Sequence, residues 1–395
     1  MKFTARRFDT GMPCEFSLAD GRIESIRPLE SSNSLRSAAG EGPLAVDLAQ
    51  ELWVAPGFVD IQVNGFGGQE FSSAELTVEA VARIATDYAA GGVTRFCPTL
   101  TTNSFAALEH GMRTIAAACR GSAELARQIA GIHLEGPYLS AEDGPRGAHP
   151  AEHCRPPDWE EFARLQAAAE GRIAIITLSP EYAEAPDFIR RATASGVCVS
   201  LGHLSASGEQ IRAAVDAGAR LSTHLGNGAH RMLRRHPNYL WDQLAEDRLW
   251  ASLIVDGQHL PPEVVQTFVR AKGLERLLLV SDLSGLAGLP PGRYESSGCE
   301  LEVLGDGRLV IAGQDQLLAG ASRHLVDGVA NIMQFAHLDL AQAVDLVTGQ
   351  PCRLLNLPLG RLEPGAPADL VLFEIVDRRL KVRSTLIAGR ISYRE

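Results

Sequence analysis

The 395-residue chain lacks the features that mark several classes of protein. Its seven cysteines are odd in number, are scattered and include no Cys-x-x-Cys pair, which favours a reducing compartment over a disulfide framework or a thiolate zinc site. No apolar run approaches the roughly 18 residues that cross a membrane, and residues 1–7 lack the apolar core of a signal peptide. We therefore expect a cytoplasmic protein with no membrane partner.

Positive charge is also in short supply. The chain has 37 Lys and Arg against 48 Asp and Glu, for a net charge of −11, and shows no basic stripe with interleaved aromatic residues. This balance argues against a nucleic-acid surface. No Gly-x-Gly-x-x-Gly turn follows a predicted strand, so nothing supports a dinucleotide-binding sheet. We expect a small-molecule substrate.

From residue 56 onward, short apolar strands alternate with amphipathic helices, the pattern of parallel β/α units. The predicted strands are 57–63, 95–98, 128–135, 173–178, 197–201, 220–223, 251–255 and 277–280. The predicted helices are 78–90, 104–119, 159–170, 183–195, 207–217, 262–272, 322–335 and 340–347. Eight strands over about 225 residues match a (β/α)8 TIM barrel; a doubly wound open sheet is the alternative.

Both ends of the chain have a different pattern. Strand-like pieces at 14–18, 22–26 and 44–48 are separated by Gly, Ser and Pro, and 31–42 is a polar loop. A turn at 360–369 feeds a strand and a further strand pair near the end. We expect an α/β protein in which residues 1–55 and 351–395 form one small β-sandwich domain beside a barrel of residues 56–350.

The segment 131–138 (GIHLEGPY) reads as a buried strand that stops at Gly136. Side chains alternate between the two faces of a strand, so His133 and Glu135 point into the same interior. Burying an acid and an imidazole there is costly unless a metal, a proton or a partner charge satisfies them. A salt bridge or a satisfied core histidine is the alternative interpretation, and for an isolated His-x-Glu it is the more common one.

Other predicted strands also end on ligand-type residues, at the face of a barrel where catalytic groups gather. These residues are Asp60, Gln62, Asn64, His203, His224, Asp256, His259 and Asp282. One carboxylate and two imidazoles, from Glu135, His203 and His224, suit a zinc site that keeps a coordination position open. Asp282 on the last strand is placed to move a proton. Each residue alone is weak evidence, and their recurrence at four strand ends predicts a catalytic metal site.

Several segments together resemble the amidohydrolase superfamily and, within it, the N-acetylglucosamine-6-phosphate deacetylases. They are 56–65 (PGFVDIQVNG), 133–138 (HLEGPY), 202–206 (GHLSA), 223–225 (THL), 256–259 (DGQH), 318–320 (LAG) and 364–370 (PGAPADL). Many superfamily members carry His-x-His on the first strand and bind two metals, whereas Gln62 and Asn64 stand at these positions here. The resemblance implies one divalent ion per chain, zinc first and iron second, with Gln62 and Asn64 as vestiges of a second-metal site.

The resemblance also implies roles for individual residues. Glu135, His203 and His224 would hold the metal, and Asp282 would be the acid/base of a deacetylation. The substrate-binding set would be His149, Asn227, Gly228, Arg235, His259, Leu318, Ala319 and Gly320. A homodimer is implied as well.

The sequence departs from the family pattern at 225–232, 233–241 and 283–288, which shape the sugar pocket. Arg231, Arg234 and Arg235 either clamp a phosphate or form a solvated loop. The expected reaction is deacetylation of N-acetylglucosamine-6-phosphate. The alternatives are N-acetylgalactosamine-6-phosphate, an unphosphorylated N-acetyl sugar, an N-acyl amino acid or a cyclic amide. A further alternative is a barrel relative without catalytic activity.

Overall fold

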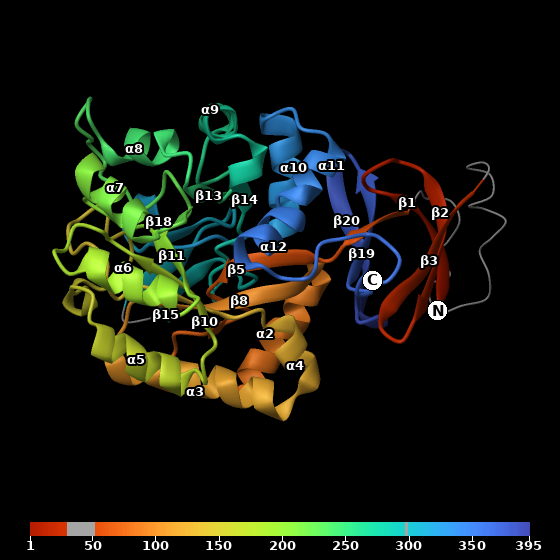
Figure 1. Cartoon of the computed structure of the whole chain (residues 1–395), viewed down its shortest axis with the longest axis horizontal. Coiled ribbons are helices and arrows are strands. Elements are labelled where there is room, and N and C mark those ends of the chain that lie inside the picture. The colour runs from red at the N-terminus through yellow and green to blue at the C-terminus, as the bar shows by residue number, and fades with distance from the viewer. Residues whose placement is uncertain (30–51, 297–298) are drawn as a thin grey trace.

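Eight parallel strands form the centre of the protein, for which a computed structural model describes residues 1–29, 52–296 and 299–395 (Figure 1). These strands are β5 (Phe58–Val63), β8 (Val93–Thr101), β9 (Ile132–Glu135), β10 (Ile173–Leu178), β11 (Cys198–Leu201), β12 (Leu221–Ser222), β13 (Trp250–Leu253) and β14 (Leu277–Leu279). Each pairs in parallel with its neighbour in chain order, from β5 to β14.

The first and last strands meet just beyond their carboxyl ends. Val63 pairs with Leu283 in a parallel bridge, and the N–H of Asp282 donates to the carbonyl of Gln62 at 3.1 Å. At the opposite end of this seam, residues 346 and 347 lie between the strands, since their carbonyls accept from Leu279 and Val59. The predicted (β/α)8 class is confirmed, with a ring that is nearly closed.

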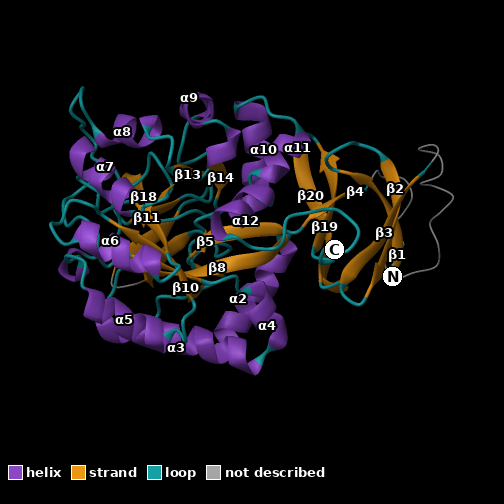
Figure 2. Cartoon of the chain, in the orientation of Figure 1, coloured by secondary structure: helices purple, strands orange, loops and turns teal. Residues whose placement is uncertain are grey.

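The helices lie around the outside of the barrel (Figure 2). They are α2 (Val78–Ala90), α3 (Phe105–Gly121), α4 (Ala123–Gln128), α5 (Trp159–Ala168), α6 (Ala185–Ala194), α7 (Gly208–Ala217), α8 (Tyr239–Ala245), α9 (Pro262–Lys272), α10 (Leu325–Phe335), α11 (Leu340–Asp345) and α12 (Gly349–Leu355), with 3-10 turns at Ala151–His153 and Leu274–Arg276. Among the described residues, none of these helices is long and apolar enough to cross a membrane.

Local sequence explains where a typical helix begins and ends. In α7, Ser207 accepts from the N–H of Gln210, and the Gln210 side chain accepts from the N–H of Ser207, which is a capping box. The helix ends at Gly218, whose φ of 119° suits glycine. Several boundaries differ from the prediction by a few residues. The strand expected at 128–135, for example, begins at Ile132, because residues 123–128 form the short helix α4.

A seven-stranded sheet is built from both ends of the chain. It contains β1 (Lys2–Arg7), β2 (Pro13–Ala19), β3 (Arg22–Pro28), β4 (Trp53–Pro56), β19 (Leu370–Val376), β20 (Arg379–Ile387) and β21 (Arg390–Arg394), in the order β21-β20-β19-β4-β1-β2-β3. Its buried residues form a separate core in which Phe16 and Val54 pack with Leu370 and Leu372. The β domain expected from the two chain ends is therefore present, while the predicted boundaries at residues 55 and 350 stay a prediction. The loop predicted at 31–42 and the strand at 44–48 lie outside the described residues.

Two smaller sheets lie beyond the barrel strands. A hairpin of β6 (Gly65–Phe66) and β7 (Gln69–Glu70) follows β5. A four-stranded antiparallel sheet of β15 (Gly292–Ser296), β16 (Cys299–Val303), β17 (Leu309–Ile311) and β18 (Gln314–Leu318) is inserted after β14. Leu301, Val303 and Leu309 of this inserted sheet pack with Leu286 in a small core of their own. The inserted sheet was not predicted from the sequence.

Candidate metal centre and substrate cavity

A cavity of about 700 Å³ opens at the carboxyl ends of the barrel strands, within the size range of small-molecule sites. It is lined by most of the residues predicted to function: Asn64, Glu135, His149, His203, His224, Asn227, Gly228, His259, Asp282, Leu318, Ala319 and Gly320. Gln62 is buried and contacts two of these residues. Arg235 is exposed and is not among the lining residues.

The three predicted metal ligands converge at the floor of this cavity. Nε2 of His224 lies 3.0 Å from Oε1 of Glu135, and Nε2 of His203 lies 3.3 Å from the same oxygen. The two Nε2 atoms are 3.0 Å apart. All three side chains are buried, so a carboxylate and two imidazoles from β9 and from the ends of β11 and β12 point at one small volume.

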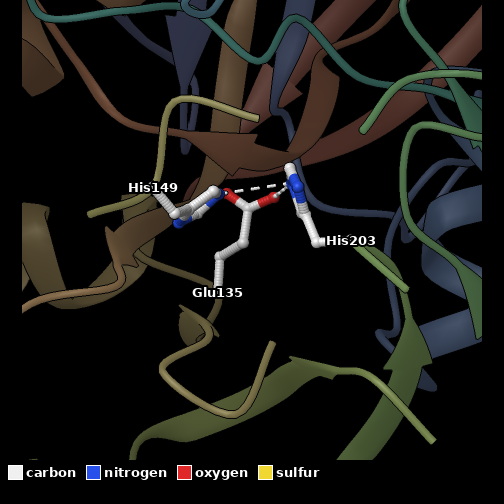
Figure 3. Close-up of side chains that lie close together, drawn as sticks. All are labelled: Glu135, His149 and His203. Atoms are coloured by element: carbon white, nitrogen blue, oxygen red, sulfur yellow. Dashed lines mark hydrogen bonds and ion pairs between the residues drawn. The ribbon is translucent and has the colours of Figure 1, made fainter. Parts of the chain in front are cut away.

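His149 adds a second possible trio to this cluster. It comes from the loop that follows β9, and its Nε2 lies 3.3 Å from Nε2 of His203. Ligand atoms of Glu135, His149 and His203 all lie within 4.8 Å of one another, and Figure 3 shows the three side chains facing each other. Two candidate trios therefore share Glu135 and His203 and differ in whether His224 or His149 is the third member.

The arrangement of lone pairs in the cluster fits a divalent cation. Nδ1 of His203 lies 2.9 Å from the carbonyl oxygen of Pro145. It must donate to this oxygen, so a neutral His203 presents the Nε2 lone pair to Glu135 and His224. Acceptors that face each other without water repel unless a proton or a cation lies between them. Imidazole nitrogen and carboxylate oxygen are the ligands that zinc takes in catalytic sites.

Electrostatics in the cluster support the same interpretation. Burial acts to raise the pKa of Glu135, but the adjacent imidazoles of His203 and His224 outweigh it and hold that pKa well below the usual range. Burial acts to lower the pKa of His224, but the hydrogen bond and charge of Glu135 raise it. An ionised carboxylate thus attracts positive charge to the point where the ligands meet.

Three of the proposed functional residues have a left-handed backbone. His203 and Asp282 have φ of 51° and His224 has φ of 30°. This conformation costs a residue with a side chain roughly 1–2 kcal/mol, and such strain tends to occur at functional sites. Each turn occurs just after a barrel strand and directs the side chain across the cavity floor.

Gln62 connects two carboxylates in this site. Its Nε2 donates to Oε1 of Glu135 at 2.9 Å and to Oδ1 of Asp282 at 3.1 Å. Asn64 Nδ2 also donates to Oδ1 of Asp282 at 2.8 Å. Because the amide nitrogens face the carboxylates, Gln62 and Asn64 act as hydrogen-bond donors in this structure.

The carboxyl group of Asp282 has an altered acidity. Burial, followed by the negative charge of Glu135, raises the pKa of Asp282 to about 6. A carboxyl group with a pKa near neutrality is suited to accept and return a proton. Burial also lowers the pKa of His149, with a further contribution from His203, to about 3, so its ring is neutral.

His133 has the satisfied role that the sequence left open. Its Nδ1 lies 3.0 Å from the carbonyl oxygen of Ile61, and its Nε2 lies 2.7 Å from Oγ1 of Thr177. Burial lowers the pKa of His133 to about 4. The ring lies inside the barrel on the same strand as Glu135, but its two nitrogens bond to other groups.

The outer wall of the cavity comes from loops and from the inserted sheet. His259 is oriented by Asp256, whose Oδ2 lies 2.9 Å from its Nδ1. Arg231 lines the wall from the loop after β12, and Arg308 lines it from the turn between β16 and β17. Arg308 also pairs with Asp306 at 2.8 Å. The contribution of Arg308 was missed because the inserted sheet was not predicted.

Comparisons with known proteins agree with this geometry. The model of the amidohydrolase family matches residues 53–392. The chain is 35% identical to N-acetylglucosamine-6-phosphate deacetylase of Bos taurus, over 86% of this chain and 83% of the relative. It is 30% identical to N-acetylgalactosamine-6-phosphate deacetylase of Escherichia coli O157:H7, over 96% and 94%. A mutant N-acetyl-D-glucosamine-6-phosphate deacetylase from Mycobacterium smegmatis, solved in complex with N-acetyl-D-glucosamine-6-phosphate, is 30% identical, with a TM-score of 0.85 over 99% of each chain.

The family match spans nearly all of the barrel and the later strands of the seven-stranded sheet. The family is metal-dependent, in agreement with the Glu and His cluster at the cavity floor. The resemblance inferred from the sequence motifs is therefore confirmed, and the chain belongs to the amidohydrolase family.

Proposed function

We propose that this protein is a metal-dependent hydrolase that removes the acetyl group from an N-acetylated amino-sugar phosphate, with N-acetylglucosamine-6-phosphate as the leading substrate. The observation that carries the proposal is that Glu135, His203 and His224 converge on one point. Asp282 is connected to this cluster because Gln62 donates hydrogen bonds to both Glu135 and Asp282. Curated relatives with this activity, 34–35% identical over most of the chain, support the choice of substrate class.

Glu135, His203 and His224 are the proposed ligands of one divalent ion, with zinc preferred over iron. We choose His224 over His149 because His224 lies two residues beyond the end of a barrel strand and contacts both other ligands, whereas His149 lies farther along a loop. When bound, such an ion supplies Lewis acidity and lowers the pKa of water toward 7.

Asp282 is the proposed acid and base. Gln62 and Asn64 donate to Oδ1, which orients the carboxyl group so that Oδ2 exchanges the proton. Oδ2 takes a proton from the water whose oxygen bonds to the acetyl carbon. As the carbon–nitrogen bond breaks, the same proton passes to the amine nitrogen, and the products are acetate and the amino sugar.

The remaining lining residues are proposed to hold the sugar and its anionic group. Neutral His149 lies beside His203, within reach of the acetyl oxygen or the sugar ring. Asn227, Gly228 and His259 are proposed to contact the sugar or its phosphate, as are the lining residues Leu318, Ala319 and Gly320. Arg231 and Arg308 bring positive charge to the outer wall, as an anionic substrate requires.

N-acetylgalactosamine-6-phosphate is the second candidate substrate. Relatives named N-acetylgalactosamine-6-phosphate deacetylase, from Escherichia coli and Shewanella, are 30% and 32% identical to this chain, close to the 34–35% of relatives named N-acetylglucosamine-6-phosphate deacetylase. The two sugars differ at one hydroxyl group, and the residues proposed to distinguish them are in the divergent segments 225–232, 233–241 and 283–288.

The homodimer and the cytoplasmic location also stay predictions. Arg235 lies on the exposed loop after β12, where Met232 is 91% exposed, and Trp241 in the following helix α8 is 51% exposed. Such side chains are common at interfaces, so this loop is where a second subunit would be expected. Light scattering of the purified protein tests the dimer.

A substrate panel tests the central proposal. Purified protein loaded with zinc is assayed for amine release from both 6-phosphates and from both unphosphorylated sugars, and its metal content is measured. We expect about one metal ion per chain and turnover of a 6-phosphate. A protein that binds one ion but releases amine only from other N-acyl compounds would overturn the substrate assignment, and one that binds no divalent ion would overturn the mechanism.

A further inference from the structure

A chain of buried polar side chains crosses the barrel beneath the proposed metal site. Oγ of Ser200 lies 2.5 Å from Oγ1 of Thr223, which lies 2.7 Å from Oγ1 of Thr177. Oγ1 of Thr177 lies 2.7 Å from Nε2 of His133, and Nδ1 of His133 lies 3.0 Å from the carbonyl oxygen of Ile61. We call Ser200, Thr223, Thr177 and His133 the hydroxyl chain. All four are at most 3% exposed.

The carbonyl at one end sets the direction of every hydrogen bond in the hydroxyl chain. A carbonyl only accepts, so Nδ1 of His133 carries the hydrogen, and Nε2 of the neutral ring is an acceptor. The hydroxyl of Thr177 must then donate to His133, that of Thr223 to Thr177, and that of Ser200 to Thr223. Each hydroxyl has one hydrogen, so removing the hydroxyl of Thr177 leaves Nε2 of His133 without its donor and the hydroxyl of Thr223 without its acceptor.

The hydroxyl chain joins strands that carry the site residues. Ile61, at its end, directly precedes Gln62, and His133 is two residues before Glu135 on β9. Thr223 directly precedes His224. The connection therefore runs across β5, β9, β10 and β11 to the end of β12. Four of its groups lie within three residues, along the chain, of a proposed metal ligand or of Gln62: Ile61, His133, Ser200 and Thr223.

Close packing at Gly202 connects the hydroxyl chain to the third proposed ligand. A Cβ at Gly202 would lie 2.9 Å from Cγ2 of Thr177 and 2.9 Å from Cβ of Thr223. Contacts this short are not tolerated without movement. The backbone just before His203 therefore packs directly against the two threonines.

We infer that the hydroxyl chain is a positioning device for the metal ligands: it holds the ends of β9, β11 and β12 at the spacing at which Glu135, His203 and His224 meet. This inference rests on the proposed metal site. Hydrogen bonds among residues that surround a metal site orient the metal ligands, and their loss typically lowers metal affinity or activity about 10–100-fold. None of the four residues lines the cavity, so substrate contacts are unchanged when the chain is broken.

Isosteric substitutions test the inference. Thr177→Val removes the hydroxyl and keeps the shape, and Thr177→Ser keeps the hydroxyl. The matched control is Thr385→Val in β20, where an equally buried hydroxyl donates to the carbonyl of Ala89 at 2.6 Å, far along the chain from the site. Zinc affinity of the metal-free proteins is measured by chelator competition well below each melting temperature, together with kcat and KM.

We expect Thr177→Val to bind zinc about 10–100-fold more weakly, with a lower kcat and an unchanged KM. Thr177→Ser and Thr385→Val should bind zinc as the wild type does, although Thr385→Val should melt earlier. If Thr177→Val does not fold, Thr223→Val takes its place, with the same expected loss.

Three results would overturn the inference. The first is wild-type zinc affinity in Thr177→Val, or in its replacement Thr223→Val. The second is an equal loss of affinity in Thr385→Val, and the third is an equal loss in Thr177→Ser. A wild-type protein that binds no divalent ion overturns the proposed function and this inference together, whereas wild-type binding with an unchanged Thr177→Val overturns the inference alone.

Discussion

The floor and the outer wall of the cavity are built on different principles. The floor consists of buried side chains at the ends of parallel strands, and each makes several hydrogen bonds to groups on other strands. The wall consists of a loop and an inserted sheet, and its two arginines are only partly buried or exposed. Rigid strand ends hold reacting groups at fixed distances, while loops vary without disturbing the barrel. We therefore expect substitutions in the floor to affect chemistry and those in the wall to affect substrate choice.

The largest effect is expected from Asp282→Asn. The amide cannot take a proton from water, so kcat should fall by about 10²–10⁴-fold, the usual contribution of a general acid and base. Metal content should stay at the wild-type level, because Asp282 is not a proposed ligand. The measurement is kcat beside metal analysis of the same sample. Activity that survives in Asp282→Asn would remove the residue from its proposed role.

His224→Ala and His149→Ala separate the two candidate trios. Loss of a ligand should weaken metal binding by more than about 100-fold, beyond what an outer-shell change causes. We expect this loss in His224→Ala. In His149→Ala we expect near-normal metal content with a lower kcat or a higher KM. If the two variants exchange these behaviours under chelator competition, His149 is the ligand and His224 is not.

A smaller effect is expected from Gln62→Met, which keeps the length of the side chain but removes both donated hydrogen bonds. Glu135 and Asp282 then lose the amide hydrogens that lie between their negative charges. We expect kcat to fall about 10–100-fold, as for other outer-shell partners, with the metal still bound. Wild-type kcat in Gln62→Met would show that the amide bridge has no part in the reaction.

The smallest effects are expected in the wall. Arg231→Ala should raise the KM for a 6-phosphate substrate about tenfold, equivalent to roughly 1.4 kcal/mol, and Arg308→Ala should do so less, because Asp306 already pairs with Arg308. The KM for unphosphorylated sugars should not change in either variant. Arg234→Ala is the control, since Arg234 is exposed and does not line the cavity. Equal effects in all three variants would indicate general electrostatic attraction instead of a phosphate contact.

Much of the floor could be predicted because its residues end strongly apolar strands. The pattern around Glu135, His203 and His224 places ligand-type side chains where parallel strands must meet. The inserted sheet escaped prediction because its strands are three to five residues long. Two of them, β15 and β16, alternate charged with other residues, and this pattern is also common in loops.

The hydroxyl chain could not be read from the sequence at all. Serine and threonine are ordinary residues in strands, and the bonded partners are 23, 44 and 46 residues apart. The direction of the Arg235 side chain could not be read from the sequence either: the family resemblance implied a substrate-binding role, but Arg235 is not among the residues that line the cavity. A position along a loop does not fix the direction of the side chain.

The sequence by itself determined the alternation of strands and helices, and it determined which kinds of side chain stand at the strand ends. Those features can be read from short stretches of sequence, because the spacing of apolar residues that distinguishes a helix from a strand involves residues close together in the chain. Only the tertiary structure decided which nitrogen of His203 faces Glu135 and the proposed metal site, that Gln62 directs its amide hydrogens between two carboxylates, and that Arg308 reaches the cavity. These outcomes depend on contacts between strands and loops distant in the sequence, which exist only once the barrel has closed.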